Sequence, residues 1–363
     1  MGETSMKLSL LRDLALRHAV DAILLQRVSS IAWATAGAAA YVNTASSKAE
    51  FALLVTAKDQ YLITNNIEAT RLEKEERLKA LGWDFQVSPW LEKDSAIYGL
   101  TKGLKLGTDN YFPSALDLSG EIAHLRANLN LEEGGRFRIL GQLCAQAMDA
   151  TARSVYPGQT EYEIAGLLAG EAESRGVQAT VNLIATDERI YNFRHPLPTD
   201  KKLDRYIMIV LCGRRWGLVC SLTRLIHFGK LPDDIRHKAE AVARVDAAMI
   251  AATRPGATLG QVFTSAQQAY AGVGYVDEWK NHHQGGPAGY EPRECLATPG
   301  SKETILAGQV YAWNPSITGC KSEDSVLISQ DGFEILSSIM GWPTMKIEIA
   351  DQIIERPDIL VVD

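Results

Sequence analysis

The sequence predicts an α+β protein of two domains, in which a smaller α/β domain precedes a larger domain with an antiparallel sheet. Helix and strand patterns alternate along the first 130 residues, which is typical of an α/β domain. In the remainder, a pair of helix patterns occurs twice, and β-rich sequence follows each pair. The length of 363 residues exceeds that of a typical single domain and also favours two domains.

The elements of the first domain follow from hydrophobic periodicity and β-rich composition. Helical spacing of apolar residues runs from Leu8 to Val20. Short runs of strand-like composition follow at 22–26, 51–56, 60–64 and 104–107. The polar, glycine-containing stretch 128–135 predicts a boundary, so the expected domains are 1–130 and 131–363.

The second domain contains a weak internal repeat. In each copy a Pro-Gly pair ends one helix pattern and a threonine precedes the next. Thr160 stands three residues before Glu163, a spacing that predicts a capping box, and Thr258 and Gln261 repeat it. The predicted helices are 137–155, 161–173, 233–253 and 259–270, and the β-rich runs are 206–211, 309–313 and 325–329. Unless Pro-Gly-x-Thr recurs by chance, two such copies predict a pseudo-twofold domain with helices on one side of an antiparallel sheet.

Composition and charge narrow the possible partners. The net charge is −7, the pI is near 5.6 and no basic run occurs, so we expect neither nucleic acid nor an anionic membrane as partner. The longest strongly apolar run, 206–212, is far shorter than the ~20 residues of a membrane helix. Five widely spaced cysteines without a Cys-x-x-Cys pair predict neither a disulfide framework nor a zinc ribbon, and a cytoplasmic location is expected.

Three short segments combine imidazole, carboxylate and glycine in a way that indicates a functional site. His195 lies in a proline-containing polar loop, and Glu323 lies in a Ser-Glu-Asp triplet. Between them, His283 is followed by Gln-Gly-Gly and, eight residues on, by Glu291. An imidazole that titrates near neutrality is suited to proton transfer. The two glycines predict a close approach of the backbone to another group, whereas the plainer interpretation makes both histidine segments solvated loops.

Taken in this order, the segments resemble the pita-bread superfamily, which includes methionine aminopeptidase, Xaa-Pro aminopeptidase, prolidase and the metal-free enzyme creatinase. The second domain is similar to the catalytic domain of these enzymes. The first domain is similar to the amino-terminal domain of creatinase and Xaa-Pro aminopeptidase. The resemblance covers nearly the whole chain and implies a homodimer, a substrate-side role for His195 and a match of His283 to a metal-ligand histidine.

Most metal-ligand positions of that superfamily carry other residues in this chain. The Leu-Thr-Arg triplet after Ser221 matches the superfamily and places this serine at the second metal-binding aspartate. The first aspartate falls on Leu211 or Cys212, and a buried structural thiol is the expected state of this cysteine. Asn314 stands at the position of the superfamily's first metal-binding glutamate, and Glu323 matches the last one. Two cations need about four or five carboxylate and imidazole ligands, so we expect no metal and no cofactor.

The predicted function is metal-independent hydrolysis of a C–N bond in a small amino-acid-like, amide or guanidino compound, by analogy with creatinase. The predicted catalytic residues are His195, His283 and Glu323. His195 would act as general base or acid, and Glu323 would orient a water or pair with a cationic group. The predicted substrate-binding residues are Tyr290, Glu291, Asn314, Ser221, Arg224 and Arg293. The substrate is expected to be a small molecule or a short peptide.

Two other functions stay open from the sequence. One is an Xaa-Pro aminopeptidase or dipeptidase with an atypical metal site that draws on Cys212, His283, Glu291 or Glu323. The other is a non-catalytic member of the fold that binds peptides in the same cleft. The joint retention of two histidines and one glutamate favours an enzyme, because drift would be indifferent to which polar residues remain.

Overall fold

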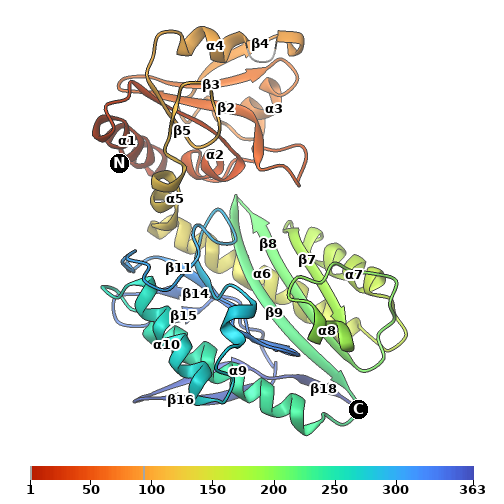
Figure 1. Cartoon of the computed structure of the whole chain (residues 1–363). Coiled ribbons are helices and arrows are strands. Elements are labelled where there is room, and N and C mark those ends of the chain that lie inside the picture. The colour runs from red at the N-terminus through yellow and green to blue at the C-terminus, as the bar shows by residue number, and fades with distance from the viewer. Residues whose placement is uncertain (1, 93–94) are drawn as a thin grey trace. The chain divides into compact units, whose positions relative to one another are not determined.

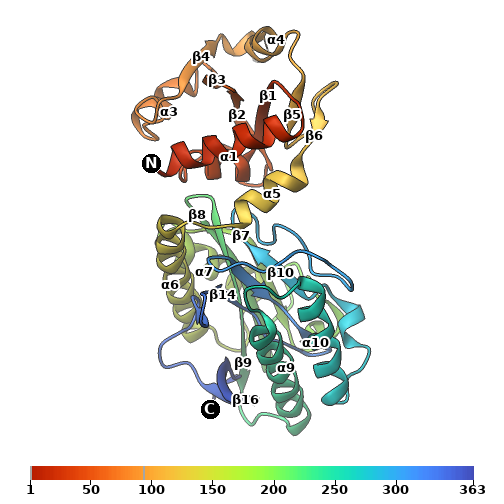
Figure 2. The same cartoon turned by 90° about the vertical axis from the view of Figure 1, so that its left-hand side faces the viewer.

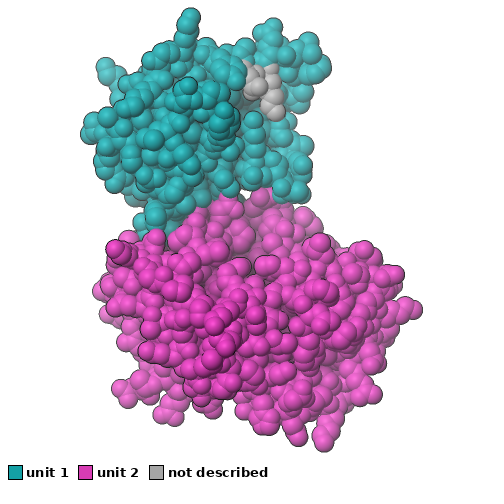
Figure 3. All heavy atoms as spheres, viewed as in Figure 1, with its two compact units in different colours: residues 1–132, 216–218 teal, residues 133–215, 219–363 magenta. Residues whose placement is uncertain are grey.

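The computed structural model describes residues 2–92 and 95–363. The chain divides into two compact units, which Figure 3 colours separately. Unit 1 comprises residues 1–132 and 216–218, and unit 2 comprises residues 133–215 and 219–363. The stretch predicted as a glycine-containing boundary is largely helical, because the helix α6 begins at Leu131 and continues through both glycines at 134 and 135. Glycine there lowers helix propensity without breaking the helix.

Unit 1 is built on a six-stranded mixed sheet with the strand order β4-β3-β2-β1-β5-β6 (Figure 1). Its strands are β1 (Ala22–Arg27), β2 (Lys48–Thr56), β3 (Gln60–Asn65), β4 (Asp84–Ser88), β5 (Leu106–Thr108) and β6 (Leu116–Asp117). Its helices are α1 (Glu3–Arg17), α2 (Val28–Ala34), α3 (Ala69–Lys74), η1 (Trp90–Glu92), α4 (Ser95–Thr101) and α5 (Ser119–Ala127). The central strand β1 is buried along nearly its whole length, and its first four residues, 22–25, are all apolar.

Unit 2 contains two four-stranded sheets, in the orders β18-β9-β8-β7 and β10-β11-β14-β15, and two short hairpins, β12-β13 and β16-β17. The strands of the first sheet are β7 (Gln178–Thr186), β8 (Tyr206–Arg215), β9 (Leu218–Phe228) and β18 (Leu360–Val362). Those of the second are β10 (Gly285–Ala288), β11 (Val310–Trp313), β14 (Asp324–Ile328) and β15 (Phe333–Ile335). The hairpins are β12 (Ser316–Ile317) with β13 (Cys320–Lys321) and β16 (Thr344–Ile349) with β17 (Gln352–Pro357).

The helices of unit 2 form two successive pairs, as the repeat predicts. They are α6 (Leu131–Ser154), α7 (Glu161–Glu173), α8 (Glu188–Asn192), α9 (Asp233–Ala252), α10 (Leu259–Gly272) and the 3-10 turn η2 (Glu278–Asn281). Both views show α9 and α10 side by side (Figures 1 and 2). The short α8 precedes the loop that carries His195, and η2 precedes the segment that carries His283.

The two helix pairs are equivalent in their hydrogen bonds as well as in their sequence. Both predicted capping boxes are present, at Thr160 and at Thr258. Each capping threonine also forms an isolated antiparallel bridge, to Lys202 in the first copy and to Thr304 in the second. Because the same local contacts recur about 100 residues apart, the Pro-Gly-x-Thr repeat reflects structural duplication rather than chance.

Strands β9 and β14 come from different copies of the repeat, and polar groups join them in the interior of unit 2. The backbone N of Ser221 donates to Ser325 Oγ at 2.9 Å, and Ser325 Oγ donates back to Ser221 O at 3.1 Å. The backbone N of Thr223 donates to Glu323 O at 3.1 Å. These contacts place the predicted residues Ser221 and Glu323 beside one another, although 102 positions separate them in the chain.

The apolar core of unit 2 draws on both copies of the repeat. It includes side chains from β8, α9, α10 and β11, such as Met208, Val242, Phe263 and Trp313. Within the part of the chain that the structure describes, no helix has both the length and the apolar character needed to cross a bilayer.

Candidate active site

The loop that carries His195 is held at both ends by one buried carboxylate. Glu161, at the start of α7, is fully buried. Its Oε1 accepts from the backbone N and Oγ1 of Thr186 at 2.9 and 3.0 Å. Its Oε2 accepts from the backbone N and Oγ1 of Thr199 at 3.0 and 2.7 Å, and also from Arg189. The segment between the two threonines is therefore closed into a loop, and His195 lies within it.

A second set of polar contacts holds this loop against η2. Arg194 Nη2 donates to Glu278 Oε2 at 3.0 Å and to Thr318 Oγ1 at 2.9 Å. Thr318 Oγ1 in turn donates to Glu278 Oε1 at 2.7 Å. Since Arg194 precedes His195 and η2 ends one residue before His282, the ion pair fixes the separation of these two histidines.

The segment after η2 is held by the side chain of Gln284, which is completely buried. Its Nε2 donates to the carbonyl oxygens of Trp279 and His282 at 3.2 and 2.7 Å. Its Oε1 accepts from the hydroxyl of Tyr270 at 3.0 Å, and this hydroxyl also accepts from the backbone N of Ser316 at 2.9 Å. A fully bonded amide of this kind restricts the backbone on either side of His283.

The two glycines after Gln284 are explained by packing within the protein. Gly285 has φ +104°, and a Cβ there would lie 2.2 Å from the carbonyl oxygen of Ala312 in β11. A Cβ on Gly286 would lie 2.3 Å from the carbonyl oxygen of Cys295. The predicted close backbone approach is thus present, and its partner is the protein's own backbone. These glycines allow β10 to pair with β11 directly beside the site.

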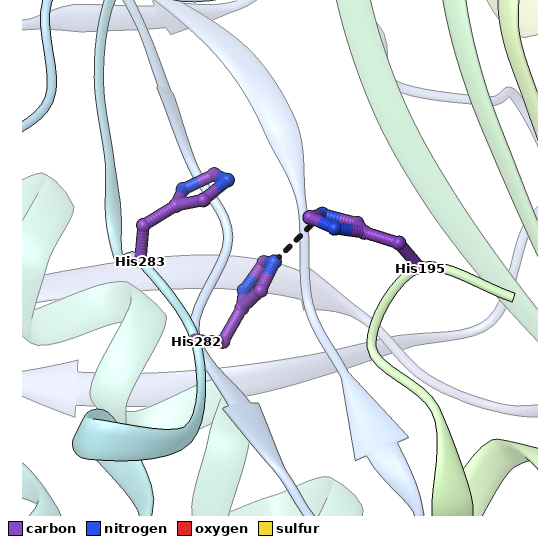
Figure 4. Close-up of side chains that lie close together, drawn as sticks. All are labelled: His195, His282 and His283. Atoms are coloured by element: carbon purple, nitrogen blue, oxygen red, sulfur yellow. Dashed lines mark hydrogen bonds between the residues drawn. The ribbon is translucent and has the colours of Figure 1, made fainter.

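Three histidines converge in the space between these two loops, as Figure 4 shows. The Nε2 atoms of His195 and His282 are 3.1 Å apart, a hydrogen bond in which one ring donates and the other accepts. The rings of His282 and His283 stack with their centroids 4.3 Å apart. One ring nitrogen of each histidine lies within 4.8 Å of the others. His195 is exposed, whereas His282 is only 9% exposed.

The surroundings of the three imidazoles favour their neutral form. Burial lowers the pKa of His282 to about 3 and that of His283 to about 4. The next largest cause is a nearby cation, Lys321 for His282 and Arg293 for His283. Burial and Lys321 also lower the pKa of His195. The cluster therefore offers unprotonated nitrogens in a field of positive charge.

The source of that positive charge is a buried ion cluster around Glu323. This carboxylate is 2% exposed. Its Oε1 accepts from Arg293 Nη2 at 2.8 Å, and its Oε2 accepts from Lys321 Nζ and Thr223 Oγ1, both at 2.7 Å. Burial alone would raise the pKa of Glu323, but the two cations outweigh burial and hold this pKa well below its usual value. With both partners charged, the trio carries one net positive charge.

These residues do not fit the two-metal centre that the superfamily uses. Besides Glu323, the guanidinium of Arg293 donates from Nη1 to Ser221 Oγ at 3.1 Å. Arg293 thus bonds to Ser221 and Glu323, the two residues predicted to stand at metal-ligand positions of the superfamily. Ser221 Oγ donates to Cys212 Sγ at 3.3 Å, and burial raises the pKa of this thiol to about 11, so the sulfur is protonated. Two protein cations stand where the ligands of a dinuclear centre would need anions.

Asn314 lies beside the histidine segment at the end of β11. Its backbone N donates to Gln284 O at 3.1 Å. Its Oδ1 is buried and has no hydrogen-bond partner among the described residues. A buried carbonyl oxygen without a donor is costly, so this atom is suited to accept a hydrogen bond from a ligand.

Tyr290 and Glu291 occupy the turn after β10, but the tyrosine is engaged elsewhere. Its side chain is 2% exposed, and its hydroxyl donates to Glu133 Oε1 of α6 at 2.7 Å. Glu294 Oε1 accepts from the backbone N of Tyr290 at 2.8 Å and of Glu291 at 3.2 Å, which closes the turn. Glu291 itself is half-buried. These bonds give the Tyr290 hydroxyl a role in packing α6 against the turn.

Arg224, which was predicted to bind substrate, lies on the face of β9 away from the histidine cluster, and its role in substrate binding stays a prediction. Ser221 and Thr223 point to the face of β9 that contacts Arg293 and Glu323, so the alternation of the strand turns Arg224 to the opposite face. Its Nη2 donates to Asp324 Oδ1 at 2.8 Å and to Ser337 O at 2.9 Å. The side chain is 2% exposed and belongs to a structural ion network.

Two residues of the site were not predicted from the sequence. His282, the immediate neighbour of the predicted His283, is not one of the predicted site residues. Lys321 is not one of the predicted site residues either. Its position two residues before Glu323, in an extended segment, was the available signal, since side chains two apart share a face.

With the site described, comparison with known proteins places the chain in a family. The sequence pattern of the metallopeptidase family M24 matches residues 135–330, which is more than half of the chain. The chain therefore belongs to the metallopeptidase family M24, and the predicted membership of the pita-bread superfamily is confirmed. An uncharacterised peptidase of Staphylococcus haemolyticus is 25% identical over 231 residues, which cover 61% of this chain and 65% of the relative. The matched region is thus less than two thirds of the relative's length.

Solved structures confirm the fold over both units. The prolidase from Pyrococcus horikoshii OT3 superposes with a TM-score of 0.79 at 19% identity and covers 92% of this chain and 98% of its own. The Xaa-Pro dipeptidase from Bacillus anthracis gives a TM-score of 0.79 at 18% identity, covering 99% of this chain and 100% of its own. The predicted α+β architecture with its additional amino-terminal domain is confirmed. At such identities the likeness concerns the fold alone.

Proposed function

We propose that this protein hydrolyses a C–N bond in a small amino-acid-like amide or short peptide without the two-metal centre of its family. The observation that carries this proposal is the guanidinium of Arg293, which bonds to Ser221 at 3.1 Å and to Glu323 at 2.8 Å. These two residues match metal-ligand positions in the family. The guanidinium of Arg293 thus supplies positive charge at a place where a two-metal peptidase would bind metal ions.

The side chains present supply the remaining parts of a hydrolytic reaction. A neutral His195 takes a proton from water as the oxygen adds to the acyl carbon, and returns a proton to the nitrogen as the C–N bond breaks. One water is consumed, and an acid and an amine are formed. His282 accepts from or donates to His195 at 3.1 Å and so orients the ring. Glu323 acts as a positioning residue that holds both cations, rather than as the group that activates water.

Charge narrows the substrate class. Lys321, Arg293 and Glu323 leave one net positive charge beside three neutral imidazoles, and desolvated charges of the same sign repel. A cationic guanidino compound is therefore disfavoured, and a neutral or anionic amide is favoured. The buried Oδ1 of Asn314 adds an acceptor suited to a substrate N–H.

The test is a hydrolysis screen on chelator-treated protein. The panel holds N-acyl amino acids, amino-acid amides and dipeptides, and product release is followed by mass spectrometry with and without EDTA. We expect one class to be cleaved at a rate that EDTA leaves unchanged. His195→Gln should lower kcat by about 10²- to 10⁴-fold, which is the usual contribution of a positioned proton-transfer group. His237→Gln is the matched control, because His237 is exposed on α9.

Two outcomes would replace the proposal. Cleavage of Xaa-Pro substrates that requires Mn²⁺ or Co²⁺ and disappears with EDTA would establish a metal-dependent peptidase with an unusual site. Tight binding of peptides without turnover, unaffected by His195→Gln, would establish a non-catalytic binding protein.

The resemblance to creatinase and Xaa-Pro aminopeptidase also leads us to propose a homodimer. Sedimentation equilibrium of the full chain should then give twice the monomer mass of 39.8 kDa. A single species at the monomer mass across the micromolar range would contradict it.

A further inference from the structure

We propose that His195, His282 and His283 form a binding site for one divalent transition-metal ion, with a donor set unlike that of the family's two-metal centre. Three imidazoles from two separate loops direct their ring nitrogens into one space, as Figure 4 shows. One nitrogen from each lies within 4.8 Å of the other two. The carboxylate of Glu323 is already bonded to Arg293 and Lys321, so the three histidines are the available donor set.

The spacing fits a single ion. Zinc binds histidine nitrogen at about 2.0–2.1 Å in tetrahedral geometry, which places two ligand nitrogens about 3.3 Å apart. The Nε2 atoms of His195 and His282 are already 3.1 Å apart. The buried Nδ1 of His283 has no hydrogen-bond partner among the described residues, so no protein group fixes the orientation of this ring through that nitrogen. Small rotations of these rings would bring all three nitrogens to bonding distance.

The loops that carry the rings are braced independently of any ion. Arg194 bonds to Glu278 and Thr318, and Gln284 bonds to the carbonyl of His282. Metal affinity rises when the ligands are held in place before the ion arrives, because less conformational entropy is lost on binding. The exposure of His195 leaves a path for the ion and an open fourth position for water or an anion.

The donor type selects the metal. Three neutral imidazoles suit Zn²⁺, Ni²⁺ and Cu²⁺, whereas Mg²⁺ and Ca²⁺ require oxygen ligands. The fixed charges of Lys321 and Arg293 oppose a cation, so binding should be weaker than at a structural zinc site that contains thiolates. One consequence rests on the proposed function. A bound ion occupies the lone pair that His195 needs for proton transfer, and Zn²⁺ should therefore inhibit hydrolysis reversibly.

Equilibrium dialysis of the untagged, chelator-treated full chain tests the site. Against Zn²⁺ we expect one ion per chain in the wild type and in His237→Gln, and no retention of Mg²⁺. His282→Gln and, separately, His195→Gln should weaken Zn²⁺ binding by more than about tenfold, since even residues that merely orient metal ligands contribute 10- to 100-fold. Co²⁺ provides a second readout, because its visible absorption reports tetrahedral nitrogen coordination. Far-ultraviolet circular dichroism checks that both variants remain folded.

The outcomes separate this site from the proposed function. Equal Zn²⁺ retention by wild type, His282→Gln and His195→Gln, or no retention by wild type, would overturn the site while leaving chelator-insensitive hydrolysis intact. One Zn²⁺ per chain that is lost in both histidine variants supports the site even where no substrate is cleaved. Activation by Zn²⁺ rather than inhibition would support the site and refute metal-independent hydrolysis.

Discussion

Glu323 shows how a buried carboxylate is held by cations that the protein itself supplies. Its two oxygens face Arg293 and Lys321. A buried charge costs several kcal/mol unless it is paired and fully hydrogen-bonded. Thr223 Oγ1 supplies the third bond to this carboxylate, at 2.7 Å. These three bonds account for an ionised carboxylate at this buried position.

This pairing predicts an acid-dependent contribution to stability. The folded-state pKa of Glu323 lies below the unfolded value of about 4.3, so the unfolded chain is protonated first as the pH falls. The stabilisation is fully present above about pH 5 and is lost toward the lower folded-state pKa. Lys321→Met should remove part of it and lower the free energy of unfolding at pH 7 by as much as about 3 kcal/mol. Urea denaturation at pH 7 and pH 4 measures both values.

The control for this substitution is Lys79→Met. Lys79 pairs with Glu73, and the two side chains are 65% and 49% exposed. An exposed pair contributes less than about 1 kcal/mol. Equal losses in the two variants would show that the buried pairing of Glu323 is not what stabilises the fold.

At the scale of the elements, the helices α7 and α10 begin with the same kind of cap in the two copies of the repeat. Thr160 accepts from the backbone N of Glu163, and Thr258 accepts from that of Gln261, each at 3.2 Å. In both copies the side chain three residues on bonds back to the threonine backbone, at 2.7 and 2.8 Å. The caps fix where α7 and α10 begin, and α7 begins with Glu161, whose carboxylate holds the His195 loop.

Removing either cap should therefore have a similar cost. Thr160→Ala and Thr258→Ala should each lower the free energy of unfolding by about 1 kcal/mol. Thr160→Ser and Thr258→Ser keep the hydroxyl and should restore most of the loss. A loss at only one of the two sites, measured by chemical denaturation, would contradict the structural equivalence of the two copies.

At the scale of the whole of unit 2, one buried ion network ties distant elements together. Arg356 of β17 bonds to Asp246 of α9 at 2.6 Å and to Asp324 of β14 at 2.9 Å. Asp324 also pairs with Arg224 of β9 at 2.8 Å. All four side chains are at most 2% exposed. The network joins one strand from each sheet to a helix and to the last hairpin, and so connects the two copies of the repeat.

Breaking this network should affect stability far more than a surface pair does. Arg356→Met leaves two buried carboxylates with fewer partners and should cost about 3–5 kcal/mol in the free energy of unfolding. Arg138→Met removes an ion pair with Glu334 whose members are both 49% exposed, and should cost less than about 1 kcal/mol. A thermal unfolding midpoint of Arg356→Met close to that of Arg138→Met would refute the role assigned to the network.

Much of the fold could be predicted because apolar spacing and helix caps depend on residues that are close together in the chain. The spacing of apolar residues identified the helices of unit 2, and the start of α7 at Glu161 agrees with the capping prediction. The domain boundary was harder, since Gly134 and Gly135 suggest a linker but lie inside α6. Helix propensity differs by only about 1 kcal/mol between glycine and alanine, and tertiary packing overrides it.

The amino-acid sequence alone determined the family and the repeat, because motifs and periodicity depend on neighbours in the chain. Only the tertiary structure decided which side chains meet. It brought His282 to His195, placed Arg293 and Lys321 on Glu323, and turned Arg224 to the other face of β9. These contacts join positions between 2 and 100 residues apart in the chain. Their geometry follows from strand pairing and loop closure, which a linear pattern does not contain.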